Sequence, residues 1–163
     1  MNPTAAAANV NQPEAQTAPP QERPPMTAPL TDHLGHYEGT GTWRDTTGTH
    51  HAYGVRLTLE ARGEALGLSF RHVFHEEAGQ PDVTLDLTLM PTAPGLLAFD
   101  LGGLPGRGHW DGATGVLAYQ VPIPGNLVEA TYLFDGGTAR VAGSSEKNAA
   151  GHHIMWTETL TRA

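Results

Sequence analysis

The sequence predicts an all-β fold: a closed, up-and-down antiparallel β-barrel of about ten strands behind a disordered N-terminal arm. Short segments that alternate apolar and polar residues follow one another from about residue 34 to residue 163. Turn-forming clusters separate these segments at intervals of roughly ten to fifteen residues, a spacing typical of a sandwich or barrel. The chain also contains 20 Gly and 13 Pro in 163 residues, which suits an all-β fold with many turns.

Residues 1–33 form the predicted arm, and residues 34–163 form the predicted barrel domain. Ala, Pro, Gln and Asn dominate residues 1–30, and no apolar period is visible there. Such a segment cannot bury enough apolar surface to offset the entropy lost on ordering. It is interpreted either as a docking arm or as a tail, and Met26 is a candidate for the true initiator.

The predicted strands begin with Tyr37–Asp45 and end with Ile154–Arg162. A period of two means that one face of a strand is buried and the other is wet. In chain order, the residues that share the apolar register of the clearest segments are Tyr53, Val55, Leu57 and Leu59; Leu66, Leu68, Phe70, His72 and Phe74; Val83, Leu85, Leu87 and Leu89; Val128, Ala130, Tyr132 and Phe134; and Ile154, Trp156, Glu158 and Leu160.

The register is weaker in residues 96–101 and 107–111. A slip of one residue there would exchange Trp110 with His109 as the interior group. These two residues lie at a hairpin with Asp111 and Gly112, where Trp110 either guards the barrel mouth or covers the barrel end.

Closure of the sheet follows from its edges. A meander of many twisted strands leaves two exposed edges unless the first strand pairs with the last. A barrel of this size has room for a small ligand. A β-sandwich is the alternative, but it needs crossing connections longer than the short turns seen here.

Composition excludes several functional classes. The formal net charge is −8, with 17 acidic and nine basic residues, so the surface repels nucleic acids and anionic membranes. The absence of Cys excludes disulfides, thiolate metal sites and thiol nucleophiles. No basic leader precedes an apolar run, and no stretch has the roughly 18 apolar residues of a membrane helix. We therefore expect a cytoplasmic protein without membrane insertion; eight Arg against one Lys suggest a GC-rich bacterial genome.

Gly41-Thr42-Trp43 resembles the Gly-X-Trp signature that opens the first strand in the calycin superfamily of lipocalins and fatty-acid-binding proteins. The resemblance implies that Trp43 packs across the closed end beneath an Arg of the last strand, for which Arg162 is the candidate. Thr46–His50 is too short for the helical pair of fatty-acid-binding proteins.

The Gly-rich first strand and the lack of a helical lid are also similar to the nitrobindin branch of ten-stranded, haem-binding barrels. That similarity implies an inward haem-ligating His near the C-terminus, with His152 or His153 as candidates. Fold similarity alone does not imply haem, and no other cofactor is expected.

Two polar residues occupy apolar registers and are the main candidates for a site. His72, between Phe70 and Phe74, is either bonded to a core carboxylate or Tyr, or contacts a ligand. Glu158 needs a partner because an isolated buried carboxylate is costly; Arg162, His72 or a ligand could supply it. The residues expected to line a cavity are Tyr53, Phe70, His72, Phe74, Leu87, Tyr119, Tyr132, Trp156 and Glu158.

No metal site is predicted from the nine histidines. The doublets His50–His51 and His152–His153 lie at turns, and adjacent strand residues point to opposite faces. The spacings of zinc and facial-triad sites are absent, as are a serine-nucleophile elbow, a P-loop and a Rossmann fingerprint.

Four functions remain open. The first is binding of a small apolar or amphipathic molecule inside the barrel. The second is acid–base chemistry of the isomerase or cyclase type, in which His72 and Glu158 must converge on one point of the cavity. The third is haem binding, which needs an axial His. The fourth is a filled barrel that acts through its surface or through an oligomer such as a homodimer.

Overall fold

The first and last strands, β1 (Gly35–Asp45) and β10 (Ile154–Arg162), run antiparallel side by side and close the sheet into a barrel. The computed structural model describes residues 29–75, 79, 81–146 and 153–163. Every other strand pairs antiparallel with its neighbours in sequence, so the predicted up-and-down barrel of ten strands is confirmed. The strands between them are β2 (His50–Arg62), β3 (Ala65–Phe74), β4 (Val83–Ala93), β5 (Leu96–Leu101), β6 (Leu104–Asp111), β7 (Val116–Ile123), β8 (Asn126–Asp135) and β9 (Thr138–Ser145).

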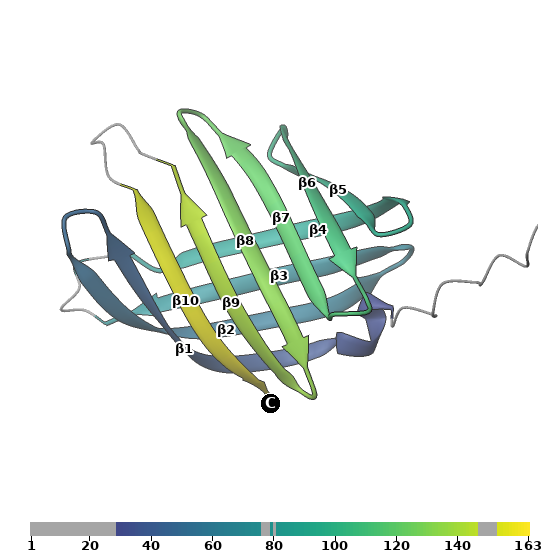
Figure 1. The fold of residues 1–163 in the computed structure, drawn as a ribbon, viewed down its shortest axis with the longest axis horizontal. Coiled ribbons are helices and arrows are strands. Elements are labelled where there is room, and N and C mark those ends of the chain that lie inside the picture. The colour runs from purple at the N-terminus through teal and green to yellow at the C-terminus, as the bar shows by residue number, and fades with distance from the viewer. Residues whose placement is uncertain (1–28, 76–78, 80, 147–152) are drawn as a thin grey trace, which may run out of the picture.

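The barrel is flattened into two layers that cross each other. In Figure 1, β7–β10 run steeply across the front and β2–β4 lie nearly level behind them. The core fills the space between the layers, where the inward positions of β2, from Tyr53 to Leu59, are buried at every second residue. The period of two in the sequence therefore identified the buried face correctly.

The structure shows which residues of β5 and β6 face the interior, which the sequence left open. Leu97 and Phe99 are buried, whereas Leu96 is exposed. On β6, Trp110 packs against the core and His109 is exposed. Trp110 therefore faces the interior.

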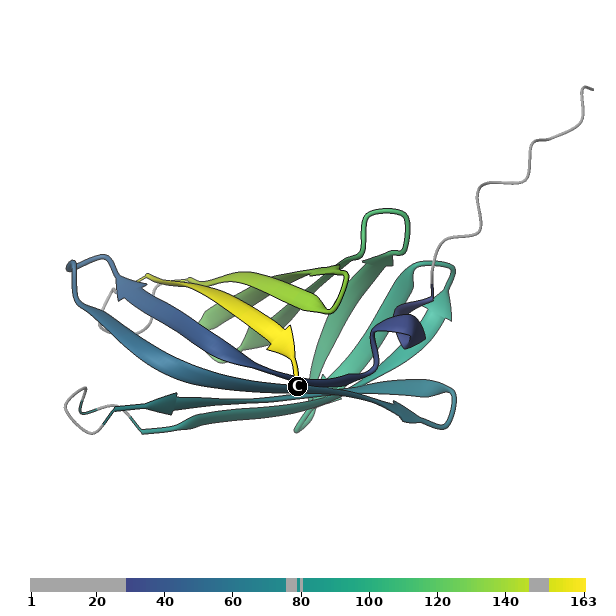
Figure 2. The same cartoon turned by 90° about the horizontal axis from the view of Figure 1, so that it is seen from below.

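The two ends of the barrel differ. The odd-numbered strands all end at the same end of the barrel, which we call the mouth. At the other end lie the turns that follow the even-numbered strands, the C-terminus and the 3₁₀ turn η1 (Leu30–His33), as Figure 2 shows from below. His33 contacts Trp110 and Phe134, with ring centroids 5.5 and 5.2 Å apart, so Trp110 helps to cover this closed end.

The described part of the predicted arm belongs to the barrel. The arm was expected to span residues 1–33, but Leu30 in η1 is buried in the core and the Arg162 Nη2 donates a hydrogen bond to the Asp32 carbonyl oxygen at 3.3 Å. A short turn of this kind carries no periodic signal in the sequence. Residues 1–28, including Met26, lie outside the described residues.

The predicted packing of Arg162 over Trp43 is wrong. Arg162 lies opposite Tyr37 in the β1–β10 register, and Trp43 lies opposite Trp156 at the other end. The Arg162 guanidinium sits 5.4 Å from the Tyr37 ring centre, and its Nη2 donates to Tyr37 Oη at 2.9 Å. Antiparallel pairing reverses the order of residues, so the C-terminal Arg162 meets the beginning of β1.

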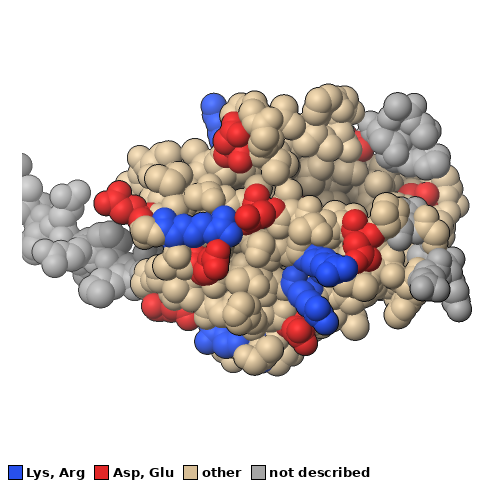
Figure 3. All heavy atoms as spheres, turned by 180° about the vertical axis from the view of Figure 1, so that it is seen from behind, with Lys and Arg blue, Asp and Glu red and all other residues tan. Residues whose placement is uncertain are grey.

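The outer surface of β1–β4 carries interleaved charges of both signs (Figure 3). Arg62 pairs with Glu60 and Asp86, and Arg71 pairs with Asp82. Exposed pairs of this kind contribute little stability. The search for a functional site therefore turns to polar groups in the interior.

The sheet has a weak seam between β4 and β5. Within the described chain, β4 pairs with β5 only near its end, over Met90–Ala93, and the register shifts between Pro91 and Ala93. The first part of β4, Val83–Leu89, is paired to β3 but not to β5.

Candidate ligand-binding site

A pocket of about 410 Å³ opens inside the mouth end of the barrel. This volume falls in the range of small-molecule sites, which are typically apolar with a few placed polar groups. Every described strand except β6 contributes to the lining, and β9 contributes only its last residue, Ser145. The lining residues are Trp43, Tyr53, Phe70, His72, Phe74, Val83, Leu85, Leu101, Tyr119, Val121, Ile123, Asn126, Val128, Ser145, Ile154 and Trp156.

Aromatic rings form the walls of this pocket because glycines on neighbouring strands make room for them. Trp156 lies directly opposite Gly143, and a Cβ on Gly143 would overlap the indole ring. Trp43 pairs with Trp156 across β1 and β10 and stacks on His51, with ring centroids 5.4 Å apart. The pocket therefore presents flat apolar surfaces near its opening.

A buried polar network lies at the inner side of the pocket. Glu158 Oε1 accepts a hydrogen bond from Tyr53 Oη at 3.0 Å and lies 2.8 Å from His72 Nε2. Glu158 is 6% exposed and His72 is 8% exposed, so water screens this contact weakly. Of the predicted alternatives for Glu158, His72 is its partner and Arg162 is not.

Gly41 allows this network to form across β1. In the strand register Gly41 lies opposite Tyr53 on one side and opposite Glu158 on the other. A Cβ at Gly41 would lie 2.6 Å from Tyr53 Cζ, closer than atoms can pack. The missing side chain lets the Tyr53 ring lie over β1 and reach the carboxylate of β10.

Three buried tyrosines keep their protons around Glu158. Burial, followed by the charge of Glu158 and their hydrogen bond, raises the pKa of Tyr53 well above its usual value. Burial raises the pKa of Tyr119 to about 12, and burial also raises the pKa of Tyr132. Tyr119 Oη and Tyr132 Oη are 3.4 Å apart. These phenols therefore act as neutral hydrogen-bond donors near the carboxylate.

His72 is held as a carboxylate-oriented imidazole. Its ring lies between Phe70, at 4.4 Å, and Tyr53, at 4.7 Å, measured between ring centroids. Nε2 is engaged by Glu158, and Nδ1 has no hydrogen-bond partner among the described residues. His72 borders the pocket, whereas Glu158 stands behind it, so the second nitrogen of the ring is the one left for a ligand.

Two further polar atoms in the pocket wall were missed in the sequence. Asn126 Oδ1 and Ser145 Oγ are buried, and neither has a hydrogen-bond partner in the described part of the chain. Both residues border the pocket. Each residue lies at a strand end beside a turn, where polar residues are common. The signal in the sequence was the alternation, because Asn126 is two residues before Val128 and four before Ala130 and so lies on the same face of the strand.

The structure brings most of the predicted site residues together. Tyr53, Phe70, His72, Phe74, Tyr119 and Trp156 border the pocket. Tyr132 and Leu87 do not border it; both are buried in the core, and Tyr132 approaches Tyr119 from behind. Glu158 reaches the pocket through His72 and Tyr53.

The described residues do not fit haem well. His72 is the histidine that borders the pocket, and its Nε2 is already held by Glu158. Haem also carries two carboxylates, and no Lys or Arg is found among the described lining residues. Of the two C-terminal candidates, His152 lies outside the described residues and His153 is not part of the lining.

Other kinds of site are not supported in the described residues. No group of three or more His, Asp or Glu there is placed to hold a metal ion. The helices found in that part of the chain include none long and apolar enough to cross a membrane.

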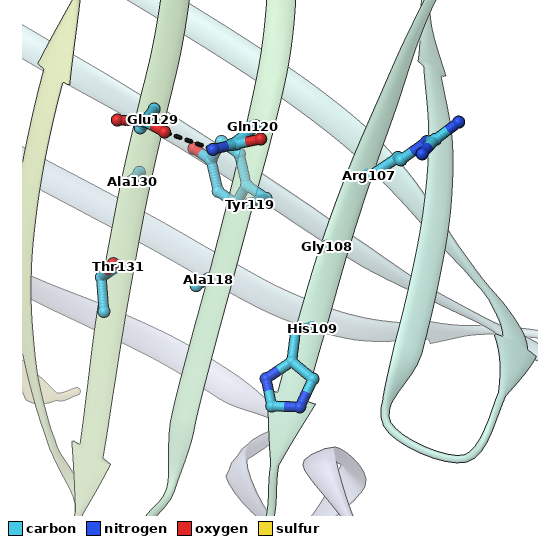
Figure 4. Close-up of a pocket in the computed structure, with 9 residues that line it drawn as sticks. All are labelled: Arg107, Gly108, His109, Ala118, Tyr119, Gln120, Glu129, Ala130 and Thr131. Carbon is cyan, nitrogen blue, oxygen red and sulfur yellow. Dashed lines mark hydrogen bonds between the residues drawn. The ribbon is translucent and has the colours of Figure 1, made fainter.

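A second hollow, of about 380 Å³, lies over β6–β8 (Figure 4). Gln120 and Glu129 are joined there by a hydrogen bond, and Arg107 and His109 project from β6. Thr131 and these side chains face outward, unlike the neighbouring Tyr119. Tyr119 is the one buried polar residue among the described lining residues of this hollow, and neither His72 nor Glu158 borders it.

Comparison with known proteins shows a common fold. No protein-family profile and no curated protein matches the sequence. The structure of the S-type phycobiliprotein lyase CPES from Guillardia theta matches with a TM-score of 0.66 and 7% identity, over 82% of this chain and 90% of that one. Rv2717c from M. tuberculosis matches with a TM-score of 0.59 and 14% identity, over 83% of this chain and 98% of that one.

A longer protein contains the same barrel. A DUF3598-family protein of unknown function from Nostoc punctiforme matches with a TM-score of 0.65 and 14% identity over 84% of this chain. This chain spans about half of that protein, 50% of its length. At such identities the likeness shows the fold alone, which is the closed antiparallel barrel that the sequence predicted.

Proposed function

We propose that this protein binds a small, largely apolar molecule in the mouth pocket and orients it through His72. The observation that carries the proposal is the buried Tyr53–Glu158–His72 network beside an open aromatic pocket. A core built only for stability has no need of a buried carboxylate, because apolar residues of similar volume serve as well or better. Polar groups that converge on an apolar pocket are instead typical of ligand sites.

The pocket also meets the energetic requirement for capture. Trp43, Phe74, Ile123 and Trp156 are only partly buried, and a ligand would remove their apolar surface from water. Each square ångström of apolar area buried contributes about 25 cal/mol. A ligand that covers these side chains would bind through the apolar area that it buries, and the few polar groups would orient it.

The first experiment is native mass spectrometry of the purified protein together with an absorption spectrum. A co-purified small molecule supports the proposal, and a Soret band would identify that molecule as haem. If the protein is purified empty, titration with Nile red, a neutral fluorescent probe, tests the pocket directly.

Variants show where Nile red binds. Val128→Phe places a ring into the pocket, and we expect at least about tenfold weaker binding. Val73→Phe is the matched control, since Val73 is exposed on the outside of β3. Equal loss of affinity in both variants, or in neither, would place the probe elsewhere and contradict the proposal.

Acid–base catalysis on the bound molecule is the second candidate. It is favoured by the contact of 2.8 Å between His72 Nε2 and Glu158, because a carboxylate that orients an imidazole is the arrangement of a general base. The name of one protein with this fold, a phycobiliprotein lyase, indicates that such barrels are compatible with catalysis.

Proton exchange tests this second candidate. If a co-purified molecule is identified, the protein should catalyse exchange of one carbon-bound proton of that molecule with deuterated water. His72→Gln should abolish that exchange while the molecule still binds. Exchange that survives in His72→Gln would remove the catalytic role and leave binding intact.

A further inference from the structure

We infer that the ligand presents an uncharged hydrogen-bond donor, and not a carboxylate, to the interior of the mouth pocket. The inference rests on the proposed function and specifies the chemical class of the ligand. It is carried by two unpartnered polar atoms in the pocket wall and by the charges around them.

The unpartnered atoms form one corner of the pocket. Ser145 lies opposite Val128 on β8, and Asn126 lies two residues before Val128 on the same face. Residues in this diagonal relation are close enough to contact one ligand group. Asn126 Oδ1 is an acceptor and Ser145 Oγ can accept, so the group they fit is an N–H or O–H.

These two atoms need a partner from outside the protein. Ser145 is 6% exposed, and a buried polar group without a hydrogen bond is destabilising. The open space beside both side chains is the pocket that they border. Rotation of the Ser145 side chain between staggered positions turns its hydroxyl toward that space.

The charges of the pocket disfavour an anion. Among its described lining residues, none is Lys or Arg, and the nearby Arg44 is exposed on the outer face of β1. With Glu158 ionised, the His72–Glu158 pair carries no net positive charge, whether or not His72 holds a second proton. A carboxylate would therefore lose its water without gaining a cation.

Three anthracene derivatives of nearly equal shape provide the test. They are 9-anthracenemethanol, which has a donor, 9-methylanthracene, which has none, and anthracene-9-carboxylate, which is charged. Their flat ring suits the walls formed by Trp43 and Trp156. Binding is followed by the fluorescence of the anthracene or by displacement of Nile red.

We expect the alcohol to bind about 3- to 10-fold tighter than the methyl compound, as one hydrogen bond allows, and the carboxylate to bind most weakly. Ser145→Ala should bring the alcohol within about twofold of the methyl compound and leave the methyl compound unchanged. Ser144→Ala is the matched control, since Ser144 points to the outer face. Asn126→Ala gives a second variant and should reduce the same preference.

The outcomes separate this inference from the proposed function. Equal binding of the alcohol and the methyl compound would overturn the inference that the ligand presents a hydrogen-bond donor. A preference for the alcohol that survives both Ser145→Ala and Asn126→Ala would overturn it as well. Tightest binding of the carboxylate would overturn the exclusion of anions and would favour haem-like or fatty-acid ligands; in each of these cases the pocket still binds. Failure of all three compounds and of Nile red would overturn the proposed function, and the inference with it.

Discussion

At the scale of single residues, the site depends on one absent side chain. Gly41 separates Tyr53 from Glu158 in the strand order, and any larger residue there would push the Tyr53 ring away from the carboxylate. The contact of His72 with Glu158 would remain, but the carboxylate would lose the phenol donor. Gly41 therefore acts on the pocket without bordering it.

Gly41→Ala should destabilise the fold by about 1–3 kcal/mol, the usual range for overpacking a core. Gly54→Ala is the control, because the nearest heavy atom to a Cβ there is 4.0 Å away and a strain-free Gly→Ala change is neutral or stabilises by about 0.4–1 kcal/mol. Urea unfolding measures both. Equal free energies of unfolding for the two variants would contradict this account of Gly41.

Tyr53→Phe should destabilise the protein by about 1.5–3 kcal/mol, because the lost hydrogen bond is made to a charged group. Tyr119→Phe should have a smaller effect, about 1 kcal/mol or less, since its hydroxyl contacts Tyr132 at 3.4 Å and not the carboxylate. Thermal and urea unfolding compare the two variants. A larger effect for Tyr119→Phe would mean that the network is centred elsewhere.

At the scale of elements, the sequence predicted what depends on local pattern. Alternation between Tyr53 and Leu59, or between Leu66 and Phe74, identifies an inward face without knowledge of the neighbouring strands. It was enough to place His72 and Glu158 inside the barrel. Their mutual contact, by contrast, depends on β2, β1 and β10 lying side by side, which no local pattern encodes.

The features that sequence reasoning misplaced or missed are those that depend on how strands pair. Arg162 was assigned to Trp43, but the β1–β10 register places it opposite Tyr37. Asn126 and Ser145 look like ordinary turn residues until β8 and β9 are paired. A shift of one residue changes such contacts completely, so they follow only from the three-dimensional structure.

The seam between β4 and β5 should be visible in hydrogen exchange. Amides of Val83–Leu89 that point toward the seam lack a partner on β5, so they should exchange faster than amides of β8, which is paired along its length on both sides. Hydrogen–deuterium exchange followed by NMR measures each amide. Uniform protection across β4 would show that the seam is closed in solution.

At the scale of the whole molecule, the buried tyrosines link stability to alkaline pH. The pKa values of Tyr53, Tyr119 and Tyr132 are raised above the ordinary value of 10.0. As the pH rises, the unfolded chain loses these protons first, so it binds fewer protons than the folded barrel and the free energy of unfolding falls. The stabilisation is complete below pH 10 and declines above it, up to about 12 for Tyr119.

We expect tyrosinate absorbance of these three residues to appear together with loss of the β-sheet circular dichroism signal above pH 10. Both signals are recorded in one alkaline titration. A full tyrosinate signal from all four Tyr of the chain while the sheet is intact would show that the phenols are accessible.

The pairing of β1 with β10 also determines when the barrel can be completed during synthesis. Tyr37 and its partner Arg162 are 125 residues apart, so at 5–20 residues per second β1 waits roughly 6–25 s for its neighbour to leave the ribosome. Until then the nascent sheet has a free edge at β1, and free edges recruit other chains. The same contact that encloses the pocket in the finished protein therefore leaves the growing chain open to aggregation until β10 has been synthesised.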